Sequence, residues 1–466
     1  MNYQVPQNID PNKIFLVNRS EIEGRLDPEQ FHKERILAIE RIKGTGNYMP
    51  LSSIASFTKT ITTHIEQGQK YVGLENIISE YGDYFETKEK QSISSAAIFK
   101  KGNILFPKLR PYLNKVFYAS FDGICSTEFY VLESRIVDAE YLSIYLRSSM
   151  VVNQTKHLVT GNTLPRLQTE DVKRLLVPVP STVIQKKIID CYNSAYDKKG
   201  QKDQQADNLL QSIDNYMLCK LGIKLPHMES QTLQDRMFIV NKSVLEERLD
   251  PYYSQEYFRN AFEVLESCKY PVVNLKEISK LITSGITPKS GGDAYTEDKS
   301  IGVPFVRSGN ISIDGELNYD DLLYLKPEIH ENVMSSSKLK KDDILIAIVG
   351  ATIGQVGIYL SEGEANINQA IALVRLKEGY NVQFIKELIK SSVGQLSLNR
   401  LKRPVARANI NLEEVSRIKV VLPPKEKQEE IVDLISEMRA QAKKLQAEGA
   451  EILQKAKMEV ERMILG

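Results

Sequence analysis

The chain has 466 residues, with 61 Lys and Arg against 60 Asp and Glu, and its formal net charge is +1. This balance excludes a uniformly basic nucleic-acid-binding protein but is compatible with local basic patches. With 42% hydrophobic and 26% charged residues, the composition is that of a globular protein. The length allows roughly two to four domains at about 100–200 residues each.

The N-terminal decapeptide MNYQVPQNID is polar and unlike a signal peptide. The most apolar stretch, Ile344–Val349, is far shorter than the ~20 residues that a membrane helix needs. The cysteines form no CxxC motif, which argues against a disulfide framework or a zinc ribbon: Cys125, Cys191, Cys219 and Cys268. We therefore expect a soluble, cytoplasmic protein with reduced thiols.

The sequence contains an internal repeat. Phe15–Ser20 is similar to Phe238–Ser243, 223 residues later, and Glu170–Arg174 is similar to Glu413–Arg417, 243 residues later. Between these points, at Gly102–Leu105, the offset is about 240. The second copy is therefore expected to carry insertions around residues 283–335. The two copies would then share a scaffold and differ in the surface that it carries.

Each half ends in a long segment rich in helix-favouring residues, after Pro180 and after Pro424. A strict 4-3 spacing selects mostly apolar residues in both segments, in one register: Ile188, Tyr192, Ala195, Lys199, Lys202, Ala206, Leu209, Ile213 and Tyr216, and Ile431, Ile435, Met438, Ala442, Leu445, Gly449, Ile452, Ala456 and Glu459. This period is typical of a coiled coil, although each helix could instead pack on its own domain. Two equivalent helices of matching phase favour mutual pairing.

The rest of each half combines short strands and helices. Runs of β-branched and aromatic residues predict strands at Val116–Ala119, Phe129–Leu132, Ile344–Val349 and Ala370–Val374. Helices are predicted at Asp138–Ser148 and Asn381–Lys390. The predicted fold is therefore α+β, with two pseudo-symmetric domains that are each followed by a long helix.

No catalytic motif is found in the sequence. Asp250–Tyr253 has only one of the two prolines of the (Asn/Asp)-Pro-Pro-aromatic motif of amino-methyltransferases, and Gly350–Gly354 lacks the lysine of a phosphate-binding loop. Glu86–Lys88 is an isolated Glu-x-Lys triplet, which is a weak nuclease signal. The five histidines lack the spacing of metal ligands. We predict no catalytic site, no metal and no cofactor.

Basic residues gather at equivalent places in the two halves. Leu398–Arg407 contains four basic residues and no acid, and its counterpart Thr155–Leu164 carries Lys156. Phe106–Lys115 combines basic, aromatic and amide groups. Lys and Arg neutralise phosphates, Arg reads guanine, and Asn or Gln reads adenine, so these runs suit DNA, although each alone could be a solvated surface.

Several short sequence segments, taken together in their order along the chain, resemble those of the specificity (S) subunits of type I DNA restriction–modification systems. They are Tyr71–Ile77, Pro111–Lys115, Gly123–Phe129, Ser284–Pro288 and Gly350–Gly354, with Gln185 and Gln428 after the (Val/Leu)-Pro endings. The resemblance covers essentially the whole chain. It implies a non-catalytic subunit whose two target-recognition domains each read one half of an interrupted, asymmetric DNA sequence.

The resemblance also implies that the two helices pair antiparallel as a spacer. It implies docking of two modification (methyltransferase) subunits and a restriction (motor and nuclease) subunit, without a membrane. The expected parts are target-recognition domain 1 at 1–180, helix 1 at 181–225, target-recognition domain 2 at 226–424 and helix 2 at 425–466. Alternatives are a DNA methyltransferase or nuclease carrying its own reader, and a coiled-coil protein-interaction scaffold.

Twelve residues in the basic and amide-rich segments are candidate contacts to double-stranded DNA: Lys108, Arg110, Lys115, Lys156, Arg166, Arg307, Asn310, Gln355, Arg400, Lys402, Arg403 and Arg407.

Overall fold

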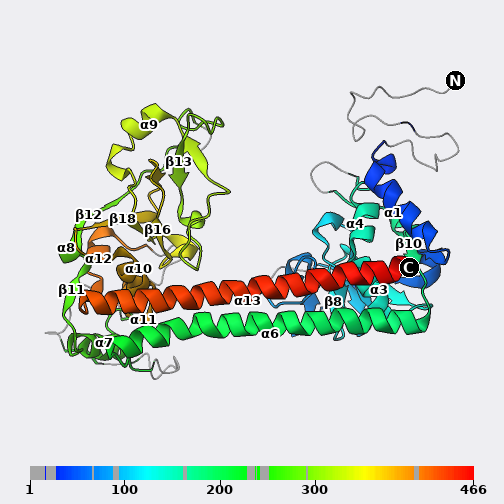
Figure 1. Cartoon of the computed structure of the whole chain (residues 1–466), viewed down its shortest axis with the longest axis horizontal. Coiled ribbons are helices and arrows are strands. Elements are labelled where there is room, and N and C mark those ends of the chain that lie inside the picture. The colour runs from blue at the N-terminus through cyan, green and yellow to red at the C-terminus, as the bar shows by residue number, and fades with distance from the viewer. Residues whose placement is uncertain are drawn as a thin grey trace. The chain divides into compact units, whose positions relative to one another are not determined.

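The computed structural model shown in Figure 1 describes residues 16, 28–65, 68–87, 94–160, 165–227, 237, 239–241, 251–289, 292–402 and 409–466. The chain forms two compact units: unit 1 is Met1–Asp203 with Leu445–Gly466, and unit 2 is Gln204–Lys444. The boundary falls inside the two long helices, α6 (Thr182–Leu221) and α13 (Lys425–Leu465). Each helix therefore contributes to both units.

The described part of unit 1 contains three sheets. Its strands are β1 (Tyr48–Pro50), β2 (Ala55–Thr58), β3 (Ile61–Thr62), β4 (Tyr71–Val72), β5 (Ala96–Phe99), β6 (Ile104–Pro107), β7 (Phe117–Tyr118), β8 (Gly123–Cys125), β9 (Phe129–Ser134) and β10 (Leu176–Pro178). The two larger sheets have the orders β2-β9-β6-β7 and β3-β5-β8-β4, and β1 pairs with β10. Only β4 and β8 pair in parallel among these strands.

Short helices complete unit 1: η2 (Pro28–Phe31), α1 (Lys33–Gly44), α2 (Leu51–Ile54), η3 (Leu74–Asn76), η4 (Pro111–Leu113), α3 (Ala139–Leu146), α4 (Ser149–Thr155) and α5 (Thr169–Lys173). Asp138 caps α3 because its Oδ1 accepts hydrogen bonds from the next turn, including one from Glu140 N at 2.8 Å. Strand β6 is buried on both faces: Ile104 and Phe106 join one hydrophobic cluster and Leu105 joins another. The core therefore lies on both sides of this sheet.

Unit 2 repeats this arrangement. Its strands are β11 (Val272–Asn274), β12 (Ser279–Ser284), β13 (Val303–Val306), β14 (Leu323–Leu325), β15 (Asp343–Ala347), β16 (Val356–Tyr359), β17 (Asn366–Ile367), β18 (Ile371–Leu376) and β19 (Lys419–Val421). The order β12-β18-β15-β16 matches β2-β9-β6-β7, and the pair β11-β19 matches β1-β10. The parallel pair β13-β17 matches β4-β8.

Further helices complete unit 2. They are α7 (Glu256–Glu266), α8 (Leu275–Ile278), η6 (Ser308–Asn310), α9 (Pro327–Glu331), η7 (Ser335–Ser337), η8 (Gly350–Thr352), α10 (Val382–Lys390), α11 (Ser392–Leu401) and α12 (Leu412–Ser416). Strand β14, α9 and η7 lie between β13 and β15. The matching interval of unit 1, between β4 and β6, holds η3 and β5, so the insertion expected around residues 283–335 falls partly on the additional helices α9 and η7.

Gln185 and Gln428 occupy the same place in the first turn of the two long helices. Gln185 Nε2 donates to the Pro180 carbonyl and Gln428 Nε2 to the Pro423 carbonyl, both at 2.8 Å. Both glutamines are buried. The repeat therefore extends to individual hydrogen bonds, although Phe15–Ser20 and Phe238–Ser243 lie largely outside the described residues.

Figure 1 shows α6 and α13 each as one continuous helix. In unit 1 the first half of α6 packs against the last part of α13. Ile188, Tyr192 and Ala195 are buried. They share a hydrophobic cluster with four buried α13 residues: Leu453, Ala456, Val460 and Ile464. Lys202 Nζ lies 2.6 Å from Glu448 Oε2 at the end of this contact.

In unit 2 the last part of α6 packs against the first part of α13, so the two segments run antiparallel there as well. Met217 and Leu221 share a cluster with Ile431 and Ile435. Lys220 Nζ lies 2.8 Å from Glu430 Oε1. The predicted α+β fold with two repeated domains and two long helices is confirmed.

The strict 4-3 register is wrong near the end of α13. Leu453 and Val460 are buried, whereas the predicted Ile452 and Glu459 are only partly so. After Gly449 the order of the spacings changes, so that Leu453 and Val460 replace Ile452 and Glu459 while Ala456 remains buried as predicted. A helix with 3.6 residues per turn drifts by ~20° per heptad from a strict 3.5 period, which explains the shift. No helix in the described part of the chain is long and apolar enough to cross a membrane.

Candidate nucleic-acid interface

A tight turn between β6 and β7 contains two residues with left-handed backbone. Arg110 and Asn114 each have a φ of 49°, and they flank η4. The turn is closed where Leu113 N donates to the Arg110 carbonyl at 2.9 Å. Asn114 is buried and its Nδ2 donates to the Arg147 carbonyl at 2.8 Å, whereas Arg110 is exposed. The turn therefore holds Arg110 at the surface.

A second segment lies beside this turn. Leu109 and Arg166 form an antiparallel bridge, and Leu167 N donates to the Lys108 carbonyl at 2.9 Å. Arg110 N donates to the Pro165 carbonyl, also at 2.9 Å. The fold thus brings the candidate Arg166 beside two candidates that are distant from it in the sequence, Lys108 and Arg110.

Several of these basic groups have partners within the protein. Arg166 donates from Nε and Nη2 to the two oxygens of Glu128, at 3.1 and 2.7 Å. Lys108 Nζ donates to the Thr127 carbonyl at 2.7 Å, and burial lowers the pKa of Lys108. Lys115 Nζ donates to a backbone carbonyl at 2.8 Å. Binding to phosphates would require these side chains to exchange partners.

Unit 2 has an equivalent turn between β15 and β16. Gly350, the first residue of η8, and Gly354, which follows Ile353, have φ of 80° and 92°. Val349 bridges Asn409, as Leu109 bridges Arg166 in unit 1. Gln355 lies just after this turn, and its Oε1 is buried without a hydrogen bond from any described residue. A tight turn at Gly350–Gly354 therefore joins β15 to β16.

Asn310 supports another turn from inside. It is buried, its Oδ1 accepts from Arg307 N at 2.9 Å, and its Nδ2 donates to the Asp321 carbonyl at 3.3 Å. Asn76 does the same in unit 1, where it accepts from Gly73 N at 2.8 Å. Arg307 Nη2 lies 3.0 Å from Asp321 Oδ2. Asn310 thus has both polar groups engaged with backbone, while Arg307 is partly exposed.

The remaining second-half candidates lie at the end of α11 and beyond it. The Arg400 guanidinium stacks over the Tyr253 ring, 3.9 Å from its centroid, and Nε donates to the Tyr253 carbonyl at 3.0 Å. Lys402 Nζ donates to Asn399 Oδ1 at 2.8 Å, and burial lowers the pKa of Lys402. Two further candidates, Arg403 and Arg407, lie outside the described residues.

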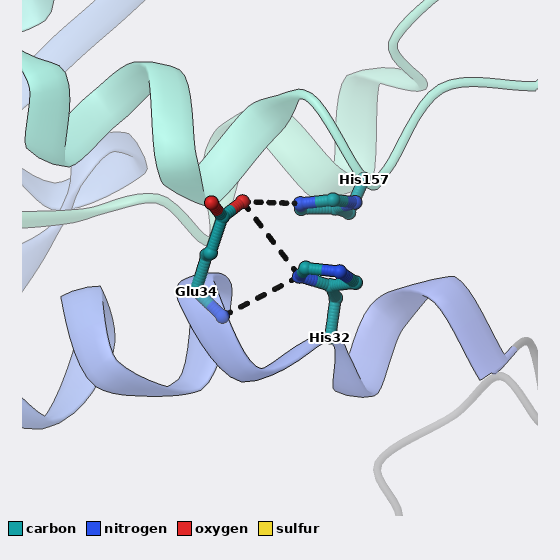
Figure 2. A group of neighbouring side chains, drawn as sticks. All are labelled: His32, Glu34 and His157. Atoms are coloured by element: carbon teal, nitrogen blue, oxygen red, sulfur yellow. Dashed lines mark hydrogen bonds and ion pairs between the residues drawn. The ribbon is translucent and has the colours of Figure 1, made fainter. Parts of the chain in front are cut away.

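Lys156 belongs to a cluster of charged groups that Figure 2 shows in part. His32 and His157 stack with ring centroids 3.8 Å apart and an interplanar angle of 14°. His157 Nε2 lies 3.1 Å from Glu34 Oε2, and Nδ1 lies 3.2 Å from Glu29 Oε2. Glu34 also pairs with Lys156, whose hydrogen bond is the largest cause that lowers the pKa of Glu34 to about 2.

This arrangement fits a metal ion poorly. Ring-nitrogen lone pairs lie in the ring planes, and the nearly parallel planes of His32 and His157 do not converge on one ion. The Lys156 ammonium also competes for Glu34. A second group, in unit 2, has buried His330 with Nδ1 2.5 Å from Asn366 Oδ1 and Nε2 3.0 Å from a carboxylate. Hydrogen bonds within the protein therefore account for both groups.

The sequence reasoning selected basic residues but missed what surrounds them. It did not identify Glu128 or Glu34 as their partners, because those carboxylates are distant in the chain. It also missed the left-handed backbone at Arg110 and Asn114. The signal for that feature is present, because the residues 240 positions later are both glycine.

Comparison with known sequences gives the following relatives. The Escherichia coli type I restriction enzyme EcoBI specificity subunit is 26% identical over 266 residues, which cover 47% of this chain and 55% of the relative. The EcoDI specificity subunit, also from Escherichia coli, is 27% identical over 132 residues, covering 28% of this chain and 30% of the relative. The chain thus spans less than two thirds of the length of either relative in these alignments.

Two solved structures align over nearly their whole length. One comes from work on complex assembly and conformational transition of the type I R-M system, with 18% identity, a TM-score of 0.49 and coverage of 90% of this chain and 96% of that chain. The other is the type I restriction-modification system S subunit from M. genitalium, with 17% identity, a TM-score of 0.39 and coverage of 89% and 95%.

A sequence model described as the type I restriction modification DNA specificity domain matches residues 58–208 and 269–454. The two matches fall one in each repeat and together make up well over half of the 466 residues. The chain therefore belongs to the type I restriction modification DNA specificity domain family.

Proposed function

We propose that this chain is the DNA-sequence specificity subunit of a type I restriction–modification complex and reads a bipartite, asymmetric DNA target. The observation that carries the proposal is a set of backbone hydrogen bonds that both halves share. This hydrogen-bond frame surrounds the β6–β7 turn in unit 1 and the β15–β16 turn in unit 2. The frame holds different side chains in the two copies. Two copies of one scaffold with different surfaces suit a target whose two halves differ in sequence.

The charges around the turns are compatible with a DNA surface. Lys156, Arg166 and Arg307 pair with carboxylates that are themselves at least partly exposed. Solvent screens surface ion pairs of this kind and they contribute little to stability, so a DNA phosphate can replace the carboxylate at small cost. We therefore retain the sequence candidates as proposed DNA contacts, with exposed Arg110 the best placed and buried Asn310 a support for its turn.

The chain is proposed to act without catalysis of its own, within a larger complex. Target-recognition domains at 1–180 and 226–424 would read the half-sites, and helices at 181–225 and 425–466 would act as the spacer and help to dock two modification subunits. Those subunits would bind the methyl donor and flip the target adenine, and a restriction subunit would join them. With a net charge of +1, the chain alone is expected to bind DNA weakly.

The test is a selection from random DNA. The chain is purified together with its modification subunits, incubated with a pool of random duplexes, and the bound DNA is sequenced. The expected result is one motif with two short specified parts separated by an unspecified gap of fixed length. Enrichment of no motif, or of a single uninterrupted one, would overturn the proposal.

A further inference from the structure

We propose that Arg110 determines a guanine in the half-site read by unit 1, and that the turn Arg110–Asn114 serves to present its guanidinium to the major groove. This assignment rests on the proposed function and names one base-reading residue within it. The starting observation is the strained backbone of Arg110, for which no contact within the described fold gives a reason.

The backbone of Arg110 is unfavourable for an arginine. Its φ of 49° lies in the left-handed region, where the Cβ of an L-residue approaches the following carbonyl oxygen. Glycine adopts this region without cost, and Asn or Asp tolerates it because a short polar side chain can bond locally. Arginine has neither advantage. Strain that persists at a surface position points to a use for the side chain.

The equivalent residue in unit 2 shows that the turn itself needs no arginine. Gly350 is 240 residues after Arg110 and has a φ of 80°. The alignment is fixed by hydrogen bonds as well as by sequence: Ile410 N donates to the Ile348 carbonyl at 3.0 Å, where Leu167 N donates to the Lys108 carbonyl. A glycine therefore builds the same turn without strain.

The other non-glycine residue of the turn has a structural explanation, and Arg110 has none. Asn114 is buried and holds the Arg147 carbonyl through its Nδ2. The side chain of Arg110 is exposed and makes no hydrogen bond, ion pair or ring contact with any residue that the structure describes. Its neighbours Lys108 and Arg166, by contrast, both bond within the protein.

The surface around Arg110 suits the edge of a base pair. Tyr112 and Leu113, at the tip of the same turn, are 47% and 38% exposed. The turn that carries the exposed Arg110 thus also exposes apolar surface. Arginine donates two parallel hydrogen bonds to guanine O6 and N7, which is the commonest specific contact in the major groove. A phosphate contact would need only positive charge, which Lys108 and Arg166 supply nearby.

The experiment compares the wild-type complex with Arg110→Gly and Arg110→Lys in the selection from random DNA, followed by binding measurements on the selected duplex. Arg110→Gly should lose the preference for guanine at one position of one half-site, by about 5- to 150-fold, while the other half-site stays unchanged. Its melting temperature should not fall, because release of the strain offsets the greater freedom of the unfolded chain. Arg110→Lys should keep the salt dependence of binding and lose part of the preference.

The matched control is Asp342→Gly. Asp342 is exposed with a φ of 70°, and the equivalent residue in unit 1 is Gly102 with a φ of 88°. This variant also replaces a left-handed, exposed residue with glycine, and it should leave both half-sites unchanged. Full guanine preference in Arg110→Gly, or uniformly weaker binding with a smaller salt dependence, would overturn the role of Arg110. Absence of any bipartite motif with the wild-type complex would overturn the proposed function, and this assignment with it.

Discussion

At the scale of single residues, Glu34 gives a pH-dependent prediction. Its pKa is lowered from 4.5 to about 2, first by Lys156 and then by His157. A lowered pKa in the folded state means that the ionised carboxylate stabilises the fold above about pH 4.5, and that this contribution is lost as the pH falls toward 2. Glu34→Gln should therefore lower the melting temperature slightly at pH 7, and the difference from the wild type should shrink from about pH 4.5 downward and close toward pH 2.

The effect is expected to be small because the Glu34 side chain is 50% exposed and solvent screens its ion pairs. Melting temperatures of the wild type and the variant, measured in parallel across this pH range, test the prediction. Glu40→Gln on the same helix is the control, because Glu40 is exposed and has no charged partner among the described residues. A melting-temperature difference between the wild type and Glu34→Gln that stays constant down to pH 3 would contradict a stabilising role for the ionised Glu34 carboxylate.

Residue types were easier to predict than residue environments. Basic character at Arg166 and Lys156 is visible in the sequence, but their partners Glu128 and Glu34 are brought near only by the fold. Asn310 was selected as an adenine-reading amide, and its buried hydrogen bonds could not be seen from one position alone. Repeats help here, since Asn76 makes the same backbone contact in the other half.

At the scale of elements, the long helices could be predicted well because their signal is local. Proline lies just before each helix, at Pro180 and Pro424, and apolar residues recur with helical spacing over 40 residues in α6 and 41 in α13. The register near the end of α13 could not be predicted from strict heptads, because a nearly straight helix drifts out of a 3.5-residue period. Leu453 replaces Ile452 at the contact for this reason.

Two helical glycines of unit 1 allow a matched test of this contact. Gly449 of α13 faces α6: an added Cβ would lie 3.3 Å from Lys199 Cγ and 3.4 Å from Lys202 Cβ. Gly200 of α6 is exposed, with no atom within 4 Å of an added Cβ. Gly449→Leu should destabilise the fold by about 1–3 kcal/mol through overpacking. Gly200→Ala should stabilise it by about 0.5–1 kcal/mol through helix propensity.

Urea denaturation of both full-length variants, followed by far-UV circular dichroism, measures the two changes in the free energy of unfolding. Opposite signs are expected from substitutions that both add side-chain atoms to a helical glycine. If Gly449→Leu were as stable as the wild type, the helices would not be in close contact at this position.

At the scale of the whole molecule, the repeat was visible in the sequence, but the division into compact units was not. The repeat assigns each long helix to the domain before it. The packing instead places Leu445–Gly466, the last part of α13, in unit 1 and Gln204–Leu221, the last part of α6, in unit 2. Sequence similarity relates copies of a segment and carries no information about which distant segment covers its apolar face.

This division predicts that one helix stabilises two different units. Leu453 and Ile435 both lie in α13 and are 2% and 1% exposed, but Leu453 belongs to the core of unit 1 and Ile435 to that of unit 2. Truncation to alanine at either site should cost about 2–5 kcal/mol through lost burial and a cavity. Hydrogen exchange read by peptide mass spectrometry on the full chain locates the loss.

For Leu453→Ala, exchange should accelerate in β6 and α3 of unit 1, with β15 and α10 of unit 2 unchanged. Ile435→Ala should give the reverse pattern, because Ile435 packs in the cluster that contains Ile344 and Phe384. The two substitutions remove similar apolar side chains from one helix, so helix propensity alone would affect both alike. Equal acceleration in both units from either variant would contradict the assignment of the end of α13 to unit 1.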